Sequence, residues 1–370
     1  MSEALRVPLC AGQRTPVPVA SRGSRDALRL IGCTMLFAAC TAAPDQNRPS
    51  GPPWEIPVVV VRYLPTSDGE LVDISATGDW GESLAYTRRK TDSLTAALIV
   101  ALEDGSRYRA FADPDAPPSL RYHVVHTEER LEPLPVLDKP GHEVPMTDYG
   151  AIAAAHDFAG WVEDEGVKEV WIWGYHGGVI DLWESNMAGP WGDVSNSDRD
   201  TLDLPVTGRT YTVYHYNYQR GLQEATENHM HQLEAVINAA DGRDSTPDDA
   251  WGDLLFWGKF VGSDISHRIV SPRCGWSHFP PNAERDYDWA NRRFVETDCE
   301  DWRPGGMGAT QQMNCERWGC TGLGWFRYWS QNIPGAGHTL SYDGRPLTNW
   351  WRLIGDYDGA MREGYGLVER

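Results

Sequence analysis

Residues 58–64 read VVVVRYL, and residues 167–174 read VKEVWIWG. Residues 58–64 are a continuous apolar run of strand length, typical of a strand covered on both faces. Residues 167–174 also read as a strand. Residues 120–126 (LRYHVVH) and 211–217 (YTVYHYN) are rich in aromatic and β-branched side chains, which strands favour. The sequence therefore predicts four strands near these positions.

Helical patterns lie between the predicted strands. Residues 94–102 carry apolar side chains at helical spacing, and Gly105 stands where a glycine often ends a helix. Thr147 or Asp148 is positioned to cap a second helix, whose apolar stripe covers residues 152–162. Strands that alternate with helices favour an α/β fold with an open, mostly parallel sheet flanked by helices. A closed barrel needs eight such units and only about four are present, so a Rossmann-like open sheet is expected.

Composition limits the classes of function. The chain has 370 residues with 33 basic and 53 acidic side chains, a net charge of −20. So acidic a surface would repel a polyphosphate, which argues against a nucleic-acid partner. The 41% of hydrophobic residues is typical of a globular chain, and no apolar run reaches the ~18 residues that a membrane-spanning helix needs.

The N-terminal segment predicts export. Three arginines occur in residues 22–29, an apolar stretch fills residues 30–39, and Cys40 follows, as in a secretory signal. The ending Phe-Ala-Ala-Cys resembles a bacterial lipobox, and this resemblance implies cleavage before Cys40 and a lipid on its sulfur. Residues 1–39 are then a lipoprotein signal peptide, and the proline-rich residues 40–57 an extended tether. The expected location is the bacterial cell envelope or surface, with membrane contact only through the lipid.

The C-terminal third differs from the rest of the chain in amino-acid composition. Ten of the 17 tryptophans lie beyond residue 250. Residues 58–241 are therefore expected to form the α/β core, and residues 242–370 a loop-rich cap or subdomain packed on it. An even number of cysteines in an exported protein predicts two disulfides, in any of three pairings, with a zinc site as the alternative. The four cysteines are Cys274, Cys299, Cys315 and Cys320.

Several common catalytic motifs do not occur. The sequence contains no HExxH, GxSxG, Walker or GxGxxG motif, so zinc-protease helices, nucleophile elbows and phosphate loops lack support. His176 and Gly177 follow a predicted strand, as in caspase-like proteases. That group needs a cysteine after the next strand, where residues 217–220 read NYQR, so this interpretation is excluded.

Polar side chains gather where two predicted strands end, the edge at which open α/β sheets bind ligands. A carboxyl group near Trp173 and Trp183 is expected to have a raised pKa and to act as an acid or base. The alternative is that these acids only belong to a very acidic surface. The expected catalytic residues are Glu184, His176 and Glu224, and the expected substrate-binding residues are Asp181, Asn186, Asn217, Arg220 and His278.

The long helical pattern of residues 220–240 offers a possible metal site. Glu227, His231 and Glu234 share one face, and a histidine with two carboxylates can bind zinc or another divalent metal, the one cofactor considered. The alternative is a solvated polar face. His229 points to the apolar side and is expected to be a hydrogen-bonded core residue.

Tryptophans are expected to play two roles. Trp171 and Trp173 fall on one side of a strand and are expected in the core. Trp350 and Trp351 are adjacent, so in an extended segment one of them is expected to be exposed, where an indole can stack on a sugar ring.

Four blocks resemble an uncharacterised family of secreted proteins. They are WESNMAGP at residues 183–190, YNYQRG at 216–221, CGWSHFPPN at 274–282 and DYDW at 286–289. The resemblance covers most of residues 57–355 and implies a single secreted module, without implying an activity.

These observations lead to three hypotheses of function. The first is an exported, lipid-anchored hydrolase of an extracellular polymer, with a surface glycan favoured, that uses carboxylate acid–base catalysis. The second is a metal-dependent hydrolase or peptidase centred on His231. The third is a surface lipoprotein that binds a glycan or another partner without catalysis.

Overall fold

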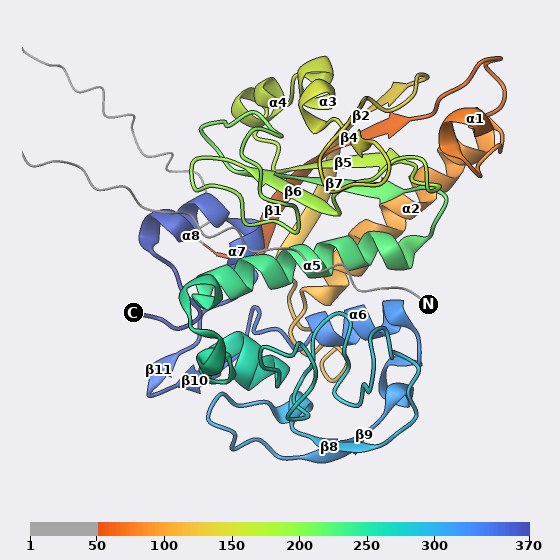
Figure 1. The fold of residues 1–370 in the computed structure, drawn as a ribbon. Helices are drawn as coiled ribbons and strands as arrows, with labels where there is room; N and C mark the ends of the chain where they lie inside the picture. The colour runs from red at the N-terminus through yellow and green to blue at the C-terminus, as the bar shows by residue number, and fades with distance from the viewer. Residues whose placement is uncertain (1–50) are drawn as a thin grey trace, which may run out of the picture. The chain divides into compact units, whose positions relative to one another are not determined.

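A five-stranded sheet with the order β2-β1-β5-β7-β6 is the centre of the fold (Figure 1). The computed structural model describes residues 51–370, so the predicted signal peptide and Cys40 lie outside the described residues. β1, β2, β5 and β7 run parallel, and β6 runs antiparallel to β7 at one edge. The strands are β1 (Trp54–Tyr63), β2 (Leu120–Arg130), β5 (Glu169–Gly174), β6 (Ser185–Ala188) and β7 (Tyr211–Asn217).

The inner strands are buried as their composition predicts. β1 lies between β2 and β5, and Val58, Val59, Val60 and Val61 are all 0% exposed. Side chains on both faces of β1 must therefore be apolar, which is why its sequence does not alternate. The expected mostly parallel α/β sheet is confirmed.

The edge strand β6 was not predicted from the sequence, which indicated only a segment leaving the third strand. Its four residues SNMA pair with β7, with Ser185 opposite Tyr214 and Ala188 opposite Tyr211. So short a strand carries no readable periodicity, and its pairing depends on tertiary contact with β7.

Helices cover both faces of the sheet (Figure 1). The long helices α2 (Leu84–Gly105) and α5 (Leu222–Ala240) lie side by side on one face, and α6 (Gly322–Ser330) packs against both. The short helices α3 (Tyr149–His156) and α4 (Phe158–Asp164) lie on the opposite face. This arrangement places α5 between the sheet and the C-terminal region.

Two predicted helix boundaries differ from the structure. Asp148 caps α3 as expected, but the helix breaks at Asp157, whose φ is 53° and whose carboxylate caps α4. Gly105 is the last residue of α2 rather than the residue beyond it, and Ser106 is the cap. A Cβ atom on Gly105 would lie 2.6 Å from Ser330 Oγ, so the glycine permits α2 and α6 to approach closely.

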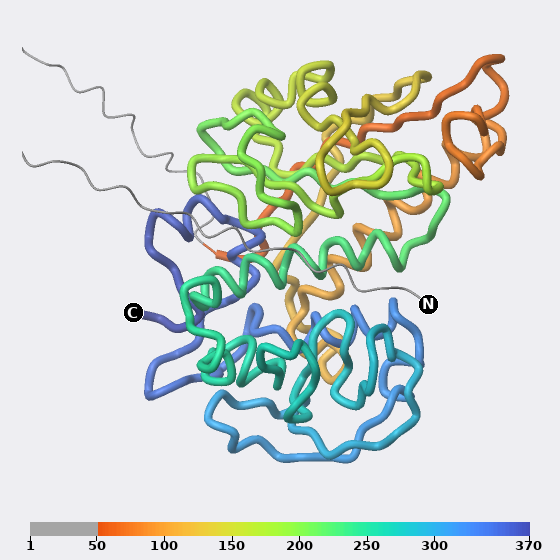
Figure 2. The backbone as a smooth tube through the Cα atoms, in the orientation of Figure 1, coloured from red at the N-terminus to blue at the C-terminus, as the bar shows by residue number. Residues whose placement is uncertain are grey.

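The chain after α5 is loop-rich and bonded by two disulfides. Figure 2 shows it as a layer beneath α5, from which the last residues return toward β1. The disulfides pair Cys274 with Cys299 and Cys315 with Cys320, which settles the choice among three pairings. Residues 51–370 belong to one compact unit. The remaining helical and strand elements are α1 (Ile74–Thr77), β3 (Val136–Leu137), β4 (Met146–Thr147), η1 (Arg243–Ser245), η2 (Asp248–Asp253), η3 (Leu255–Val261), β8 (Val295–Thr297), η4 (Cys299–Asp301), β9 (Gln311–Met313), η5 (Cys315–Trp318), β10 (Ser341–Tyr342), β11 (Arg345–Pro346), α7 (Arg352–Gly355) and α8 (Tyr357–Glu363).

Tryptophans are used mainly in the interior. Trp171 and Trp173 are 0% exposed, which confirms their expected place in the core. The expectation that Trp350 or Trp351 is exposed was wrong, because both are buried. The chain there is a turn leading into α7 rather than an extended segment, so both indoles point inward. Within residues 51–370, no helix combines the length and the apolar character needed to cross a membrane.

A carboxyl group is buried at the start of β5. Glu169 is 3% exposed, and its Oε2 accepts a hydrogen bond from Trp171 Nε1 at 2.8 Å. Burial raises the pKa of Glu169 from its ordinary value of 4.5 to about 8. The folded chain therefore keeps a proton that the unfolded chain loses, and the free energy of unfolding falls as the pH rises between these two values.

We expect Glu169→Gln to be more stable than the wild type at about pH 9, by roughly 2 kcal/mol, and nearly equal to it at about pH 5. Glutamine keeps the acceptor for Trp171 but carries no charge that would need burial. Urea unfolding at both pH values measures the difference, with the exposed Glu143→Gln as the matched control. An equal gain at both pH values would contradict this assignment.

Candidate functional site

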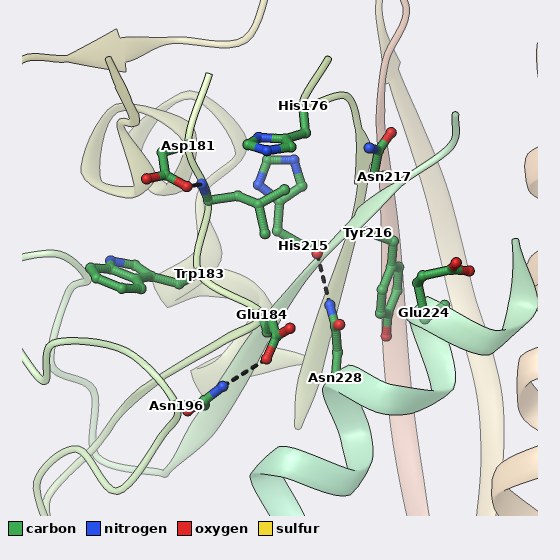
Figure 3. Close-up of a pocket in the computed structure, with 12 residues that line it drawn as sticks. His176, Asp181, Trp183, Glu184, Asn196, His215, Tyr216, Asn217, Glu224 and Asn228 are labelled. Carbon is green, nitrogen blue, oxygen red and sulfur yellow. Dashed lines mark hydrogen bonds between the residues drawn. The ribbon is translucent and has the colours of Figure 1, made fainter. Parts of the chain in front are cut away.

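A cavity of about 410 Å³ opens where β5 and β7 end (Figure 3). The loop after β5, the end of β7 and the first turns of α5 form its walls, at the edge predicted from the strand order. The residues that line it are His176, Asp181, Leu182, Trp183, Glu184, Asn196, His215, Tyr216, Asn217, Glu224, Ala225 and Asn228.

Five of the residues predicted as catalytic or substrate-binding lie around this cavity: Glu184, His176, Glu224, Asp181 and Asn217. Three others do not line it. Asn186 is buried in β6, Arg220 is exposed, and His278 belongs to a neighbouring cluster of side chains.

The beginning of α5 aims polar groups at the cavity. Gly221 is the N-cap, and its backbone N–H donates to Glu224 Oε2 at 3.1 Å. One turn later, Asn228 Nδ2 donates to the carbonyl oxygen of His215 at 2.9 Å. Glu224 and Asn228 therefore face the strand ends because helical spacing puts them on one side of α5.

The opposite side of α5 packs on the sheet. His229 is buried there, and its Nε2 lies 2.6 Å from Tyr216 Oη. Burial holds the pKa of His229 well below its usual range. The expected hydrogen-bonded core histidine is confirmed.

Three potential metal ligands converge further along α5, on the side that Glu224 begins. Glu227 and His231 come from the helix, and His278 comes from the C-terminal region. Their ligand atoms lie within 4.8 Å of one another. His231 Nε2 is 2.9 Å from His278 Nε2, and Glu227 Oε1 is 3.2 Å from the same nitrogen. We call these three residues the His–His–Glu cluster.

Each imidazole of the His–His–Glu cluster is oriented by a carboxylate on its far side. Glu184 bonds His231 Nδ1, and Asp286 lies 3.0 Å from His278 Nδ1. Both Nε2 atoms are thereby directed to the same point. Carboxylates that fix the second ring nitrogen are typical of histidines that bind metals.

Glu184 joins this cluster to the cavity, because it lines one and bonds the other. Asn196 Nδ2 also donates to its Oε2, at 2.6 Å. Burial alone would raise the pKa of Glu184, but the charge and hydrogen bond of His231 and the hydrogen bond of Asn196 outweigh burial and lower it. The expected raised pKa was wrong, since the partner that controls Glu184 is a histidine, 47 residues away, rather than a tryptophan.

The contact between Glu184 and His231 also shifts the pKa of His231. Burial alone would lower the pKa of His231, but the carboxylates of Glu184, Glu234 and Glu227 outweigh it and raise it to about 9. His231 Nδ1 faces Glu184, and its Nε2 faces His278 Nε2. A divalent ion at this point would be held by the unprotonated Nε2 atoms, so it would compete with protons for them.

Glu234, also predicted as a ligand, holds the C-terminal region instead. Its carboxylate accepts the Ser277 backbone N–H at 2.7 Å and the Ser277 hydroxyl at 3.2 Å. Glu227 and Glu234 are 8% and 7% exposed, so this side of α5 is covered rather than solvated.

Tryptophan indoles fix the segment that carries His278. Trp289 and Trp325 donate to the Ser277 carbonyl at 2.9 and 3.0 Å, and Trp329 donates to the Gly275 carbonyl at 2.9 Å. The disulfide at Cys274 anchors the start of the same segment. The tryptophan-rich composition therefore serves to position His278 on α5.

Sequence reasoning did not identify Asn196, Asn228, Asp286 or Tyr287 as parts of the site. Asp286 and Tyr287 belong to the DYDW block, which was the one signal pointing to them. The Tyr287 ring lies over His278 with a centroid separation of 4.2 Å. Burial and nearby carboxylates, including Glu227 and Asp286, raise the pKa of Tyr287.

Comparison with known proteins gives no relative: no family model matches the chain, and no curated protein matches it. The resemblance carried by the four sequence blocks remains a prediction. Function is therefore inferred from the geometry of the site.

We expect Glu234→Ala to reduce the free energy of unfolding by about 1–3 kcal/mol, because it leaves the buried Ser277 N–H without an acceptor. Glu234→Gln keeps an acceptor oxygen and is the matched variant, expected to lose less. Chemical denaturation of both variants measures the difference. If the alanine variant were as stable as the glutamine variant, the Ser277 contact would not hold the segment in place.

Proposed function

We propose that this chain is a metal-dependent hydrolase that acts outside the cytoplasm and holds a divalent ion of the zinc type at Glu227, His231 and His278. The observation that carries the proposal is the convergence of two Nε2 atoms and a carboxylate, with both Nδ1 atoms facing carboxylates. Two histidines and one glutamate are a ligand set of catalytic zinc sites, in which one position stays open.

The side chains around the ligands suit hydrolysis. An ion held there supplies Lewis-acid polarisation of a substrate carbonyl or phosphoryl oxygen. Glu184 bonds His231 Nδ1 on the side away from the three ligands and also lines the cavity, so it orients the ligand and can contact a substrate there. Asn196 holds Glu184 in place.

Metal-dependent chemistry has more support than carboxylate acid–base cleavage of a glycan. A glycosidase acid must carry a proton at neutral pH, whereas the pKa of Glu184 is lowered. Hydrolysis of a glycan by Glu184 and Glu224 thus becomes the alternative outcome of the experiments. Partner binding without catalysis is a second alternative outcome of the experiments.

We also propose that the chain is exported from the cytoplasm. Both disulfides lie in the region that positions His278, and such bonds persist in oxidising compartments. The predicted lipobox at Cys40 supports a lipid-anchored location at the cell envelope. An extracellular polymer is then the substrate. The tether that reaches it from the membrane ends before β1, because residues 54–57, predicted as part of the tether, belong to that strand.

We expect the full chain, stripped with a chelator, to bind one zinc ion, as measured by isothermal titration calorimetry and elemental analysis. Asp286→Asn is expected to weaken zinc binding about 10- to 100-fold, and His278→Ala to weaken it further. His123→Ala, which alters an exposed histidine outside the site, is the matched control. Failure to bind zinc or another transition metal, or equal affinity in His278→Ala, would remove the metal site.

Activity is tested on panels of peptides and glycans. We expect the zinc-loaded chain to hydrolyse a member of these panels, and we expect the chelated chain to be inactive until zinc is returned. Hydrolysis that survives chelation but is lost in Glu184→Gln would instead favour the carboxylate mechanism. Stoichiometric zinc without turnover on either panel would overturn the assignment as a hydrolase and leave a metal-stabilised binding protein.

A further inference from the structure

We propose that the cavity beside the His–His–Glu cluster binds a basic side chain of a peptide substrate, which makes the enzyme a peptidase or amidase selective for lysine or arginine. This inference rests on the proposed function, because it assigns the substrate of that same site. Three independent features of the cavity carry it.

The first feature is the charge of the lining. Asp181, Glu184 and Glu224 contribute carboxylates, and none of the described residues that line the cavity is lysine or arginine. Histidines pair with two of these acids, His142 with Asp181 at 2.7 Å and His231 with Glu184. Carboxylates that share one hollow repel one another, and a bound cation would offset that repulsion.

Glu224 is the acid with the weakest pairing. Its Oε2 accepts a backbone N–H from Gly221, an interaction that does not neutralise it. The charge of Lys90 acts on Glu224, but the ammonium group of Lys90 lies over the ring of Trp80, 4.4 Å from its centroid. A cation that enters the cavity therefore finds one carboxylate without a salt bridge.

The second feature is an acceptor atom that lacks a donor. Asn228 is 7% exposed, and its amide N–H₂ group is used by the His215 carbonyl. Its Oδ1 has no hydrogen-bond donor among the described residues, and Figure 3 shows the side chain in the cavity between Glu184 and Glu224. This oxygen faces the cavity with its acceptor capacity free, so a ligand that donates hydrogen bonds fits here.

The third feature is an apolar strip in the same wall. Leu182, Trp183 and Ala225 line the cavity beside the acids. A lysine or arginine side chain combines an alkyl stem with a cationic tip, and the strip and the carboxylates match these two parts. Burial, the larger cause, and the charge of His176 lower the pKa of His215 to about 3, so His215 itself adds no positive charge to the lining.

The test uses the chelated full chain, so that binding in the cavity is separated from the metal. The probes are Nα-acetyl-lysine amide, Nα-acetyl-arginine amide, the uncharged Nα-acetyl-norleucine amide and glucosamine, measured by calorimetry. We expect at least one basic amino-acid amide to bind about tenfold or more tightly than the norleucine amide. Glu224→Gln keeps the acceptor for Gly221 and is expected to remove about tenfold of that affinity.

Asp181→Asn provides a second variant if Glu224→Gln does not fold, and the exposed Glu143→Gln is the control expected to change nothing. Equal affinity for the lysine, arginine and norleucine amides, or no loss in either cavity variant, would overturn the proposal. Tighter binding of glucosamine than of both amino-acid amides would overturn it in favour of an amino sugar.

Failure of the basic-side-chain proposal can be distinguished from failure of the metal-site proposal. Zinc binding of Glu224→Gln is expected to equal that of the wild type, since Glu224 touches none of the three ligands. Loss of charge selectivity with intact zinc binding would reject the basic side chain only. Charge selectivity without zinc binding would reject the metal-dependent mechanism only.

Discussion

The contact between His231 and His278 is the interaction on which the account depends. Their Nε2 atoms lie 2.9 Å apart, although one residue belongs to α5 and the other to the disulfide-bonded C-terminal region. Two imidazole nitrogens that face each other need either a shared proton or a shared ion between them. The surrounding carboxylates favour positive charge at this point, in either form.

Most of the C-terminal region can be understood as the support for this contact. The Cys274–Cys299 disulfide, the Glu234–Ser277 hydrogen bonds and the indole N–H groups all act on the few residues around His278. Each bond fixes backbone that would otherwise be a free loop, and a ligand held by a rigid support needs little reorganisation to bind an ion. The abundance of tryptophan thus has a structural explanation, and none of the sugar-stacking geometry expected at Trp350 or Trp351 is present.

The sequence predicted the sheet well because its signals are local. The run at residues 58–64 and the stripe at residues 220–240 report strand and helix through the spacing of their own side chains, and the structure has both. The short strand β6 was not predicted from the sequence, because it is defined by its pairing with β7 rather than by a pattern of its own.

The candidate site was predicted in part, for a physical reason. Glu227 and His231 share a face because helical geometry requires it, but no spacing rule places His278 beside them or turns Glu234 toward Ser277. The pKa of Glu184 could not be predicted from the sequence for the same reason. Its burial was foreseeable from neighbouring apolar residues, whereas its pairing with His231 depends on how α5 packs against β6.

X-ray absorption spectroscopy of the zinc-loaded full chain tests the central claim most directly. The account predicts a first shell of two imidazole nitrogens and carboxylate or water oxygens, at about 2.0–2.2 Å, without sulfur. A shell that contains sulfur, or one with no imidazole scattering, would contradict it. Either result would show that the ion, if bound at all, is not held between α5 and His278.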